Sequence, residues 1–413
     1  MLFISPFFGV LFGYFIFIIS FLIPSSLFHN LVGENNYGFL SIESLFFVTF
    51  CVLSFVIGLH SYNMIPRKKT VYIDKPYRVT SPKAMIFLLL LLNITMFFIV
   101  YLIVRNNAGL ISAVLYYSGG VKSLKSEMDL SGTYASVSSA IYGLSTWCLY
   151  VYFKLRDTLA KWNRRFILFL IIILYALLIF KTLLLLARFE LMPLLVSFIV
   201  VYLWSKYNEG KSAKVFIMLI VFFISIVTIF YIISKLRNTE GNSYDSWVSF
   251  FGYIFVPYSH LGALLSGQLK YLDPGFGYYA VNFLNSLPVI GDYMTRSFFS
   301  WPDSYIVWQR EFQDTWQAGL NGDLIWITAF GYLWVSLKLA TPLYMFINGI
   351  LVQAAWNGFK KGKLLGIIFY PWCFFCVLFW FGMNMISFRT TLYLMISAIF
   401  IYFFSFLQKK ITY

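Results

Sequence analysis

Charged residues are scarce in this chain. Asp, Glu, Lys and Arg make up 11% of its 413 residues, whereas 60% are hydrophobic. A soluble domain carries about 25% charged residues, so this composition could not cover a water-exposed surface. The composition therefore excludes a soluble enzyme and predicts an integral membrane protein.

Cysteine and histidine are also scarce, which limits the chemistry available. All four cysteines lie inside apolar runs, so neither a disulfide framework nor a loop-borne zinc site is indicated. Cys373 and Cys376 form a C-x-x-C between aromatic residues, a pattern typical of helix packing. The three histidines are scattered, and the sequence has no H-E-x-x-H or P-loop; Gly275 and Gly277 mark a turn. We expect no cofactor and no bound metal.

Long apolar runs are what the sequence has in place of charge. A hydrocarbon core of about 30 Å needs roughly 20 apolar residues per helix. Ten such runs lie at 3–28, 40–59, 84–104, 134–153, 166–184, 189–204, 215–234, 339–356, 364–383 and 390–407. The sequence predicts an all-α, polytopic integral membrane protein, a single transmembrane domain over residues 1–413 with ten spans.

Basic residues gather in five short clusters between these runs, and their positions predict the orientation. The clusters are Arg67, Lys68, Lys69, Lys75, Arg78 and Lys83; Lys154, Arg156, Lys161, Arg164 and Arg165; Lys206, Lys211 and Lys214; Lys360, Lys361 and Lys363; Lys409 and Lys410. All five fall on one side of the ten-span arrangement. Because short cytoplasmic loops retain Lys and Arg, both termini are predicted to be cytoplasmic. The net charge of +15 then indicates contact with anionic membrane lipid, with no nucleic acid as a partner.

A large outer loop is predicted at 235–337, between the seventh and eighth runs. It holds eight of the 16 acidic residues, and loops of this length usually carry function. It also contains two semi-apolar stretches, at 247–267 and 324–337, which we expect to be re-entrant or interfacial helices. If both stretches instead cross the membrane, the count becomes twelve with the same orientation.

Two cations interrupt the apolar sequence between 166 and 204. One continuous helix over this range would be about 59 Å long, roughly twice the membrane core. The sequence therefore predicts two spans joined by a small outer turn at 181–188, which contains Lys181 and Arg188. Pro193 is expected in the first turn of the returning helix, where its missing N–H is not needed.

Arg188 has two interpretations. Its side chain could extend to the outer headgroups, as long cationic side chains do. Alternatively, the guanidinium and the N-terminus of the returning helix could together bind a phosphate. Arg237, just after the seventh run, is expected at the same outer depth. Several cations at one membrane level predict a receptor for a lipid-linked pyrophosphate.

These features resemble the bacterial O-antigen polymerases of the Wzy type, also described as oligosaccharide repeat unit polymerases. The resemblance covers ten to twelve spans, a small outer loop with an arginine, here Arg188 in "LARFELMP", and a large outer loop late in the chain. It extends to "KLRNTEGN", which contains Arg237, and to "PGFGYYAVNFLNSLPVIG" and "GDLIWITAFGYLWVSL" in the large loop.

The resemblance implies a multi-pass glycosyltransferase-type enzyme of the bacterial inner membrane. Such an enzyme joins undecaprenyl-pyrophosphate-linked oligosaccharide units at the periplasmic face into O-antigen or a related surface polysaccharide. A chain-length regulator and a flippase are further candidate partners. Two alternatives stay open: a ligase that moves finished polymer onto lipid A core, and a flippase or exporter of lipid-linked polysaccharide. The internal repeats usual in transporters are not seen in this sequence.

The candidate site residues follow from that implied chemistry. Arg188 and Arg237 are the candidates for the pyrophosphate, with Lys181, Arg296 and Arg389 as further cations. A base must also remove a proton from the attacking hydroxyl. His260 is the candidate because it is the large loop's one histidine and would titrate near neutrality, although a packing role is equally open. The alternatives are Asp323, also a candidate for substrate binding, and Glu190, which could instead neutralise Arg188.

Overall fold

The protein is built from α-helices. The computed structural model describes residues 2–34, 39–64, 81–109, 132–185, 188–209, 243–288 and 290–411, together with positions 217, 224, 227 and 228. Within these ranges 82% of the residues are helical and none is in a strand. The predicted all-α class is therefore confirmed, and the apolar length of several helices identifies a membrane protein.

The helices fall into two halves along the chain. The first half contains α1 (Pro6–Leu22), α2 (Ser25–Val32), α3 (Ile42–Met64), α4 (Pro82–Asn106), α7 (Gly132–Leu155), α8 (Lys161–Leu184) and α9 (Arg188–Asn208). The second contains α11 (Ser243–Leu265), α12 (Tyr278–Val281), α13 (Gly291–Phe299), α14 (Ser304–Gln317), α15 (Thr328–Leu337), α16 (Thr341–Lys360), α17 (Leu364–Leu378) and α18 (Arg389–Ile411). Short 3₁₀ turns lie at Leu2–Ile4, Asn282–Ser286, Lys338–Ala340 and Met385–Ser387.

Five helices of the described ranges are long and apolar enough to cross a membrane. They are α3, α4, α8, α9 and the 33-residue unit Thr328–Lys360, which joins α15 to α16. Each corresponds to one predicted run. The first predicted run is instead bent by 107° between α1 and α2. The run at 215–234 lies almost wholly outside the described residues, so ten spans and their orientation stay predictions.

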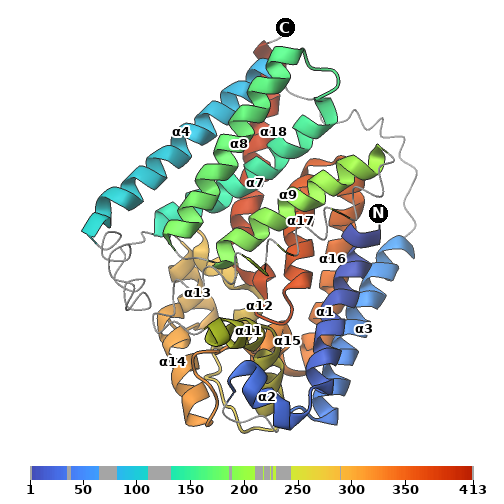
Figure 1. The fold of residues 1–413 in the computed structure, drawn as a ribbon, viewed down its shortest axis with the longest axis vertical. Helices are drawn as coiled ribbons and strands as arrows, with labels where there is room; N and C mark the ends of the chain where they lie inside the picture. The colour runs from blue at the N-terminus through green and yellow to red at the C-terminus, as the bar shows by residue number, and fades with distance from the viewer. Residues whose placement is uncertain are drawn as a thin grey trace.

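The apolar helices form two packed groups (Figure 1). One group holds α4, α7, α8 and α18, and the other holds α1, α3 and α16, with α9 and α17 between them. Each group has its own buried hydrophobic cluster, and α17 contributes residues to both. The large-loop helices α11 to α15 gather with α2 at the end of the molecule farthest from the C terminus.

The second semi-apolar stretch of the large loop extends a candidate span. Its helix α15 runs through the 3₁₀ turn at Lys338–Ala340 directly into α16. Lys338, in this turn, has a positive φ of 49°. The candidate span therefore begins at Thr328, inside the range 235–337 that was predicted as the large loop.

Two glycines allow α3 and α16 to touch. A Cβ added at Gly58 would lie 2.1 Å from the carbonyl oxygen of Phe346, and one added at Gly349 would lie 2.2 Å from that of Phe55. Small residues at such crossings let helix backbones approach closely, which gives dispersion contacts where no hydrophobic driving force operates between helices in lipid. This contact fixes one side of the bundle.

We expect Gly58→Ala to destabilise the protein, because the added methyl group can be accommodated only if two backbones move apart. Overpacking of this kind costs about 1–3 kcal/mol. Thermal unfolding of the purified protein in detergent measures the loss. The control is Gly109→Ala, since a Cβ there meets no atom within 4 Å. Equal melting temperatures for the two variants would contradict the close crossing.

Candidate functional site

A cavity of about 210 Å³ lies where α7, α8, α9 and α18 meet. The side chain of Lys181, on α8, lines this cavity and is only 3% exposed. Its Nζ donates to Ser138 Oγ at 2.8 Å and pairs with Glu190 Oε2 at 2.6 Å. We refer to this space as the cation cavity.

Arg389 lines the same cavity from the first residue of α18. Its side chain is half-buried, and within the described part of the chain it has no carboxylate partner. The first turns of α9 and α18 both contribute lining residues, so the partial positive charges of two helix N-termini lie near one space. Two cations and two helix starts against the one carboxylate of Glu190 leave the cavity electropositive.

The partners of Lys181 explain how an ammonium can be buried here. A charge withdrawn from water is tolerated only when it is paired and hydrogen-bonded. Ser138 is also buried, whereas the side chain of Glu190 is 37% exposed. Glu190 is thus the partner that can exchange with solvent or with a ligand. An anion entering the cavity could take its place on Lys181.

The turn between α8 and α9 differs in one detail from its prediction. α8 ends at Leu184 and α9 begins at Arg188, which agrees with a break inside 181–188. Pro193, expected in the first turn of α9, instead lies in the second, and its carbonyl accepts from Tyr142 Oη at 3.2 Å. Because α9 begins at Arg188, its first turn consists of Arg188 to Leu191, and Pro193 comes after it. The side chain of Arg188 itself lies outside the described part of the structure.

A second cavity, of about 180 Å³, contains a buried carboxylate. Glu311 of α14 is 4% exposed, and it accepts from Tyr279 Oη at 2.6 Å and from Tyr332 Oη at 3.4 Å. Its lining comes from α12, α14, α15 and the segment before α18. We refer to this space as the carboxylate cavity.

Burial raises the pKa of Glu311 from its ordinary value of 4.5 to about 7. The hydrogen bonds from the two tyrosines act in the opposite direction but do not cancel the loss of solvation. Burial and the nearby carboxylate also raise the pKa of Tyr279, so this phenol keeps its proton and donates it. A carboxylate with a pKa near 7 can act as a general base at neutral pH.

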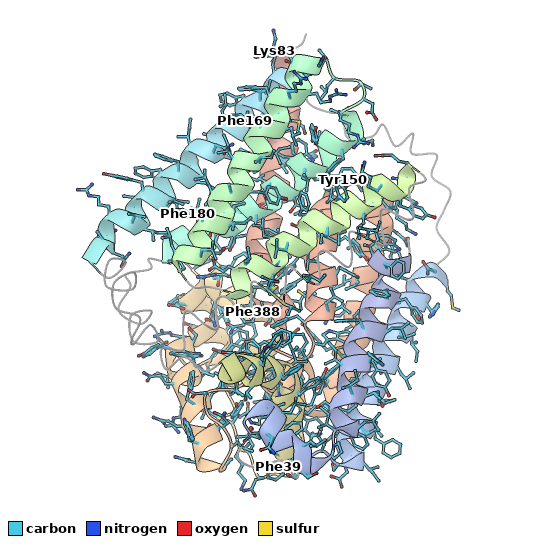
Figure 2. The ribbon with its side chains drawn as sticks, viewed as in Figure 1. Phe39, Lys83, Tyr150, Phe169, Phe180 and Phe388 are labelled. Carbon is cyan, nitrogen blue, oxygen red and sulfur yellow. The ribbon has the colours of Figure 1, made fainter. Side chains whose placement is uncertain are left out.

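The two cavities adjoin across the segment between α17 and α18. Phe388, labelled near the centre of Figure 2, lines both of them. Asn384, four residues earlier, donates from Nδ2 to the carbonyl of Tyr279 at 2.8 Å and to Tyr344 Oη at 3.2 Å. These bonds tie the segment to the large loop and to α16. The segment therefore holds Arg389 on one side and faces Glu311 on the other.

His260 lies in neither cavity. Its side chain and that of Glu34 are both fully buried, and His260 Nε2 lies 2.6 Å from Glu34 Oε2. Glu34 also accepts the backbone N–H of Asn321 at 2.9 Å. The pair joins α11 to the segment after α2 and to the loop before α15. The packing interpretation of His260 is the one that this geometry favours.

The remaining predicted residues are not gathered with Lys181. Arg296 of α13 is half exposed and pairs with Asp303 at 3.0 Å and with Asp292 at 3.9 Å. Asp323 is exposed, and its backbone N–H donates to Asn321 Oδ1 at 3.0 Å. Arg237 lies outside the described residues. Of the predicted set, the structure brings together Lys181, Glu190 and Arg389.

Glu311 was not predicted as a functional residue, although the sequence shows that it lies on the buried face of its helix. Val307, Glu311 and Thr315 recur every four residues and are the buried positions of α14. Residues at i, i+4 and i+8 share one face of a helix, so a carboxylate on the apolar face is exceptional. In the described ranges there is no group of three or more His, Cys, Asp or Glu that could hold a metal ion.

We expect the stability of the protein to fall as the pH rises from about 4.5 to about 7, because folded Glu311 still holds its proton where the unfolded chain has released it. Above pH 7 both forms are ionised, and the cost stays constant at about 3 kcal/mol. Glu311→Gln removes this cost and should unfold at a higher temperature than the wild type at pH 8. Thermal unfolding in detergent from pH 5 to pH 8 measures the difference.

The matched control for that measurement is Asp292→Asn, which makes the same change of charge at an exposed position of α13, outside the carboxylate cavity. It should not raise the unfolding temperature at pH 8. A Glu311→Gln variant that melts below the wild type at every pH would show that the carboxylate stabilises the fold.

No family model, curated protein or solved structure matches this chain. The resemblance to the O-antigen polymerases therefore stays a prediction. Its chemical requirements can be compared with the cavities directly. They are an anion receptor and a base, in positions that one substrate could reach together.

Proposed function

We propose that this protein polymerises lipid-linked oligosaccharide repeat units, as the resemblance implies. The observation that carries the proposal is the adjacency of the cation cavity and the carboxylate cavity, which share Phe388. The donor is an oligosaccharide on undecaprenyl pyrophosphate, and the acceptor is a hydroxyl of a second lipid-linked unit. The reaction takes place at the periplasmic face of a bacterial inner membrane.

In this proposal the cation cavity holds the pyrophosphate. Arg389 offers a planar fork that matches two phosphate oxygens, and Lys181 offers an ammonium once Glu190 gives way. The N-termini of α9 and α18 add unpaired backbone N–H groups suited to an anion. Arg188, the first residue of α9, is the third cation in this proposal.

The chemical step needs charge stabilisation and one proton transfer. The bond between the anomeric carbon and the pyrophosphate oxygen breaks, and its electron pair leaves on the pyrophosphate. The acceptor oxygen forms a new bond to the anomeric carbon, and its proton passes to the carboxylate of Glu311. Fixed cations around the leaving group favour the developing charge without reorganisation at the moment of reaction.

The experiment that tests the function is the glycolipid ladder of a strain lacking the protein. Polymerase activity requires collapse of the ladder to a single repeat unit on carrier or core. Long chains that persist on the carrier without transfer to core would instead indicate a ligase. Absence of repeat units from the outer face would indicate a transporter.

We expect Arg389→Ala to abolish chain extension when it replaces the wild type in that strain. Loss of one group that stabilises transition-state charge typically costs about 100-fold or more in rate. Because Arg389 forms no ion pair within the described residues, the variant should fold normally. Arg105→Ala is the matched control, since it removes an exposed arginine in the last turn of α4, outside both cavities. A wild-type ladder from Arg389→Ala would remove this residue from the mechanism.

We expect Glu311→Gln to slow extension by about 100-fold or more, the usual contribution of a general base. The wild-type rate should rise with pH and level off above about 7, where Glu311 is ionised. The variant should lose this dependence while keeping its fold. In vitro polymerisation with purified protein and lipid-linked units across pH 5.5 to 8.5 measures both. A preserved pH profile in Glu311→Gln would assign the base elsewhere.

A further inference from the structure

A third cavity, of about 370 Å³, lies at the ends of α7 and α9 that are far from the cation cavity. The end of α7, the end of α9 and the turn between α16 and α17 form its walls. Lys154 lies 16 residues after Ser138 on α7, which separates this cavity from the cation cavity by about 24 Å along the helix. In Figure 2, Tyr150 of this cavity lies nearer than Phe388 to the end marked by Lys83.

Cations outnumber carboxylates in this cavity. Four cations line it, namely Lys154, Arg156, Lys360 and Lys361, against the carboxylates of Asp157 and Glu209. Arg156 pairs with both of these carboxylates. Within the described ranges this leaves the three lysines without a carboxylate partner. The cavity therefore keeps a net positive charge.

The turn between α16 and α17 brings these lysines together. Gly362 has a left-handed φ of 68°, and a Cβ placed there would lie 3.2 Å from Tyr150 Oη and 3.4 Å from Lys154 Nζ. This close approach sets Lys360 and Lys361 beside Lys154, although about two hundred residues separate them in sequence. The N-terminus of the 15-residue α17 follows at once and adds its partial positive charge.

A long apolar groove begins at the same turn. It encloses about 1130 Å³ between α16, α17 and α18, and Lys361 and Gly362 line both the groove and the basic cavity. Leu351, Ile399 and Phe403 line the groove and are each more than half exposed. An apolar channel that opens at a cluster of lysines matches a molecule with an acyl chain and an anionic head.

We propose that this composite site binds an anionic glycerophospholipid, with the phosphate at Lys154, Lys360 and Lys361 and one acyl chain in the groove. A soluble anion would leave the groove unused. A zwitterionic lipid would bring a positive charge close to the lysines, which would repel it. The proposal does not depend on the polymerase function, because the site lies at the opposite ends of α7 and α9 from the cation cavity.

The test is lipid binding by the purified full-length protein in detergent, measured by native mass spectrometry with phosphatidylglycerol and phosphatidylcholine. The triple variant Lys154→Gln, Lys360→Gln, Lys361→Gln should bind phosphatidylglycerol more weakly by about fivefold per lysine, roughly 100-fold in all. The matched control Lys161→Gln, Arg164→Gln, Arg165→Gln removes the same charge near the start of α8, outside the cavity, and should bind as the wild type does. Equal loss in both triple variants would mean diffuse surface attraction and would overturn the site.

A second variant tests the groove without changing charge. Ala354→Trp fills the groove from α16 and should weaken phosphatidylglycerol binding, whereas Ile57→Trp on the exposed face of α3 should not. If Ala354→Trp binds both inorganic phosphate and phosphatidylglycerol as tightly as the wild type, the lysines bind a soluble anion and the proposal is wrong. If the protein prefers a polyprenyl phosphate to phosphatidylglycerol, the groove holds an isoprenoid chain and the proposed lipid is also wrong.

Folding is checked by elution volume and by melting temperature in phosphatidylcholine. If the triple variant does not fold, Lys361→Gln alone should show a fivefold loss, because this residue lines both cavity and groove. Unchanged affinity in that single variant would overturn the proposal.

Discussion

The burial of Lys181 is the constraint on which the arrangement of the candidate site depends. An ammonium in an apolar helix bundle must keep its partners, and Lys181 obtains them from Ser138 on α7 and Glu190 on α9. The ion pair therefore helps to set the position of α9 relative to α8, and the first turn of α9 lines the same cavity as the start of α18. Glu190 is the more exposed partner, so an anionic ligand could reach the buried ammonium of Lys181 only by displacing Glu190.

The segment between α17 and α18 connects this ion pair with the large loop. Asn384 bonds to the backbone of Tyr279 and to Tyr344, and Ser387 Oγ donates back to the carbonyl of Asn384 at 2.7 Å. These bonds hold Phe388 between the two cavities. The only helical part of this segment is the 3₁₀ turn Met385–Ser387, and side-chain amide and hydroxyl bonds to the backbone hold the rest. The two cavities are thus formed by different elements but share this one connecting segment.

Much of the fold could be predicted from the sequence, because apolar length alone identifies helices such as α3, α4 and α8. The candidate site could be predicted only in part. Lys181 stood out as a cation in apolar sequence, but its partner Ser138 lies on another helix and no local pattern relates the two. His260 was attractive for its chemistry, yet the buried carboxylate of Glu34 that pairs with it lies 226 residues away. Periodicity reports the face of a helix and not what packs against it.

Two buried carboxylates in this protein show how burial can serve structure or chemistry. Glu34 is matched by His260 and by a backbone N–H, and it lines neither cavity of the candidate site. Glu311 has neutral phenols as its partners, lines a cavity and titrates near pH 7. An apolar residue at that position of α14 would avoid the cost of burying a carboxylate. A cost of this kind, located beside an electropositive cavity, is what the proposed reaction would require of its base.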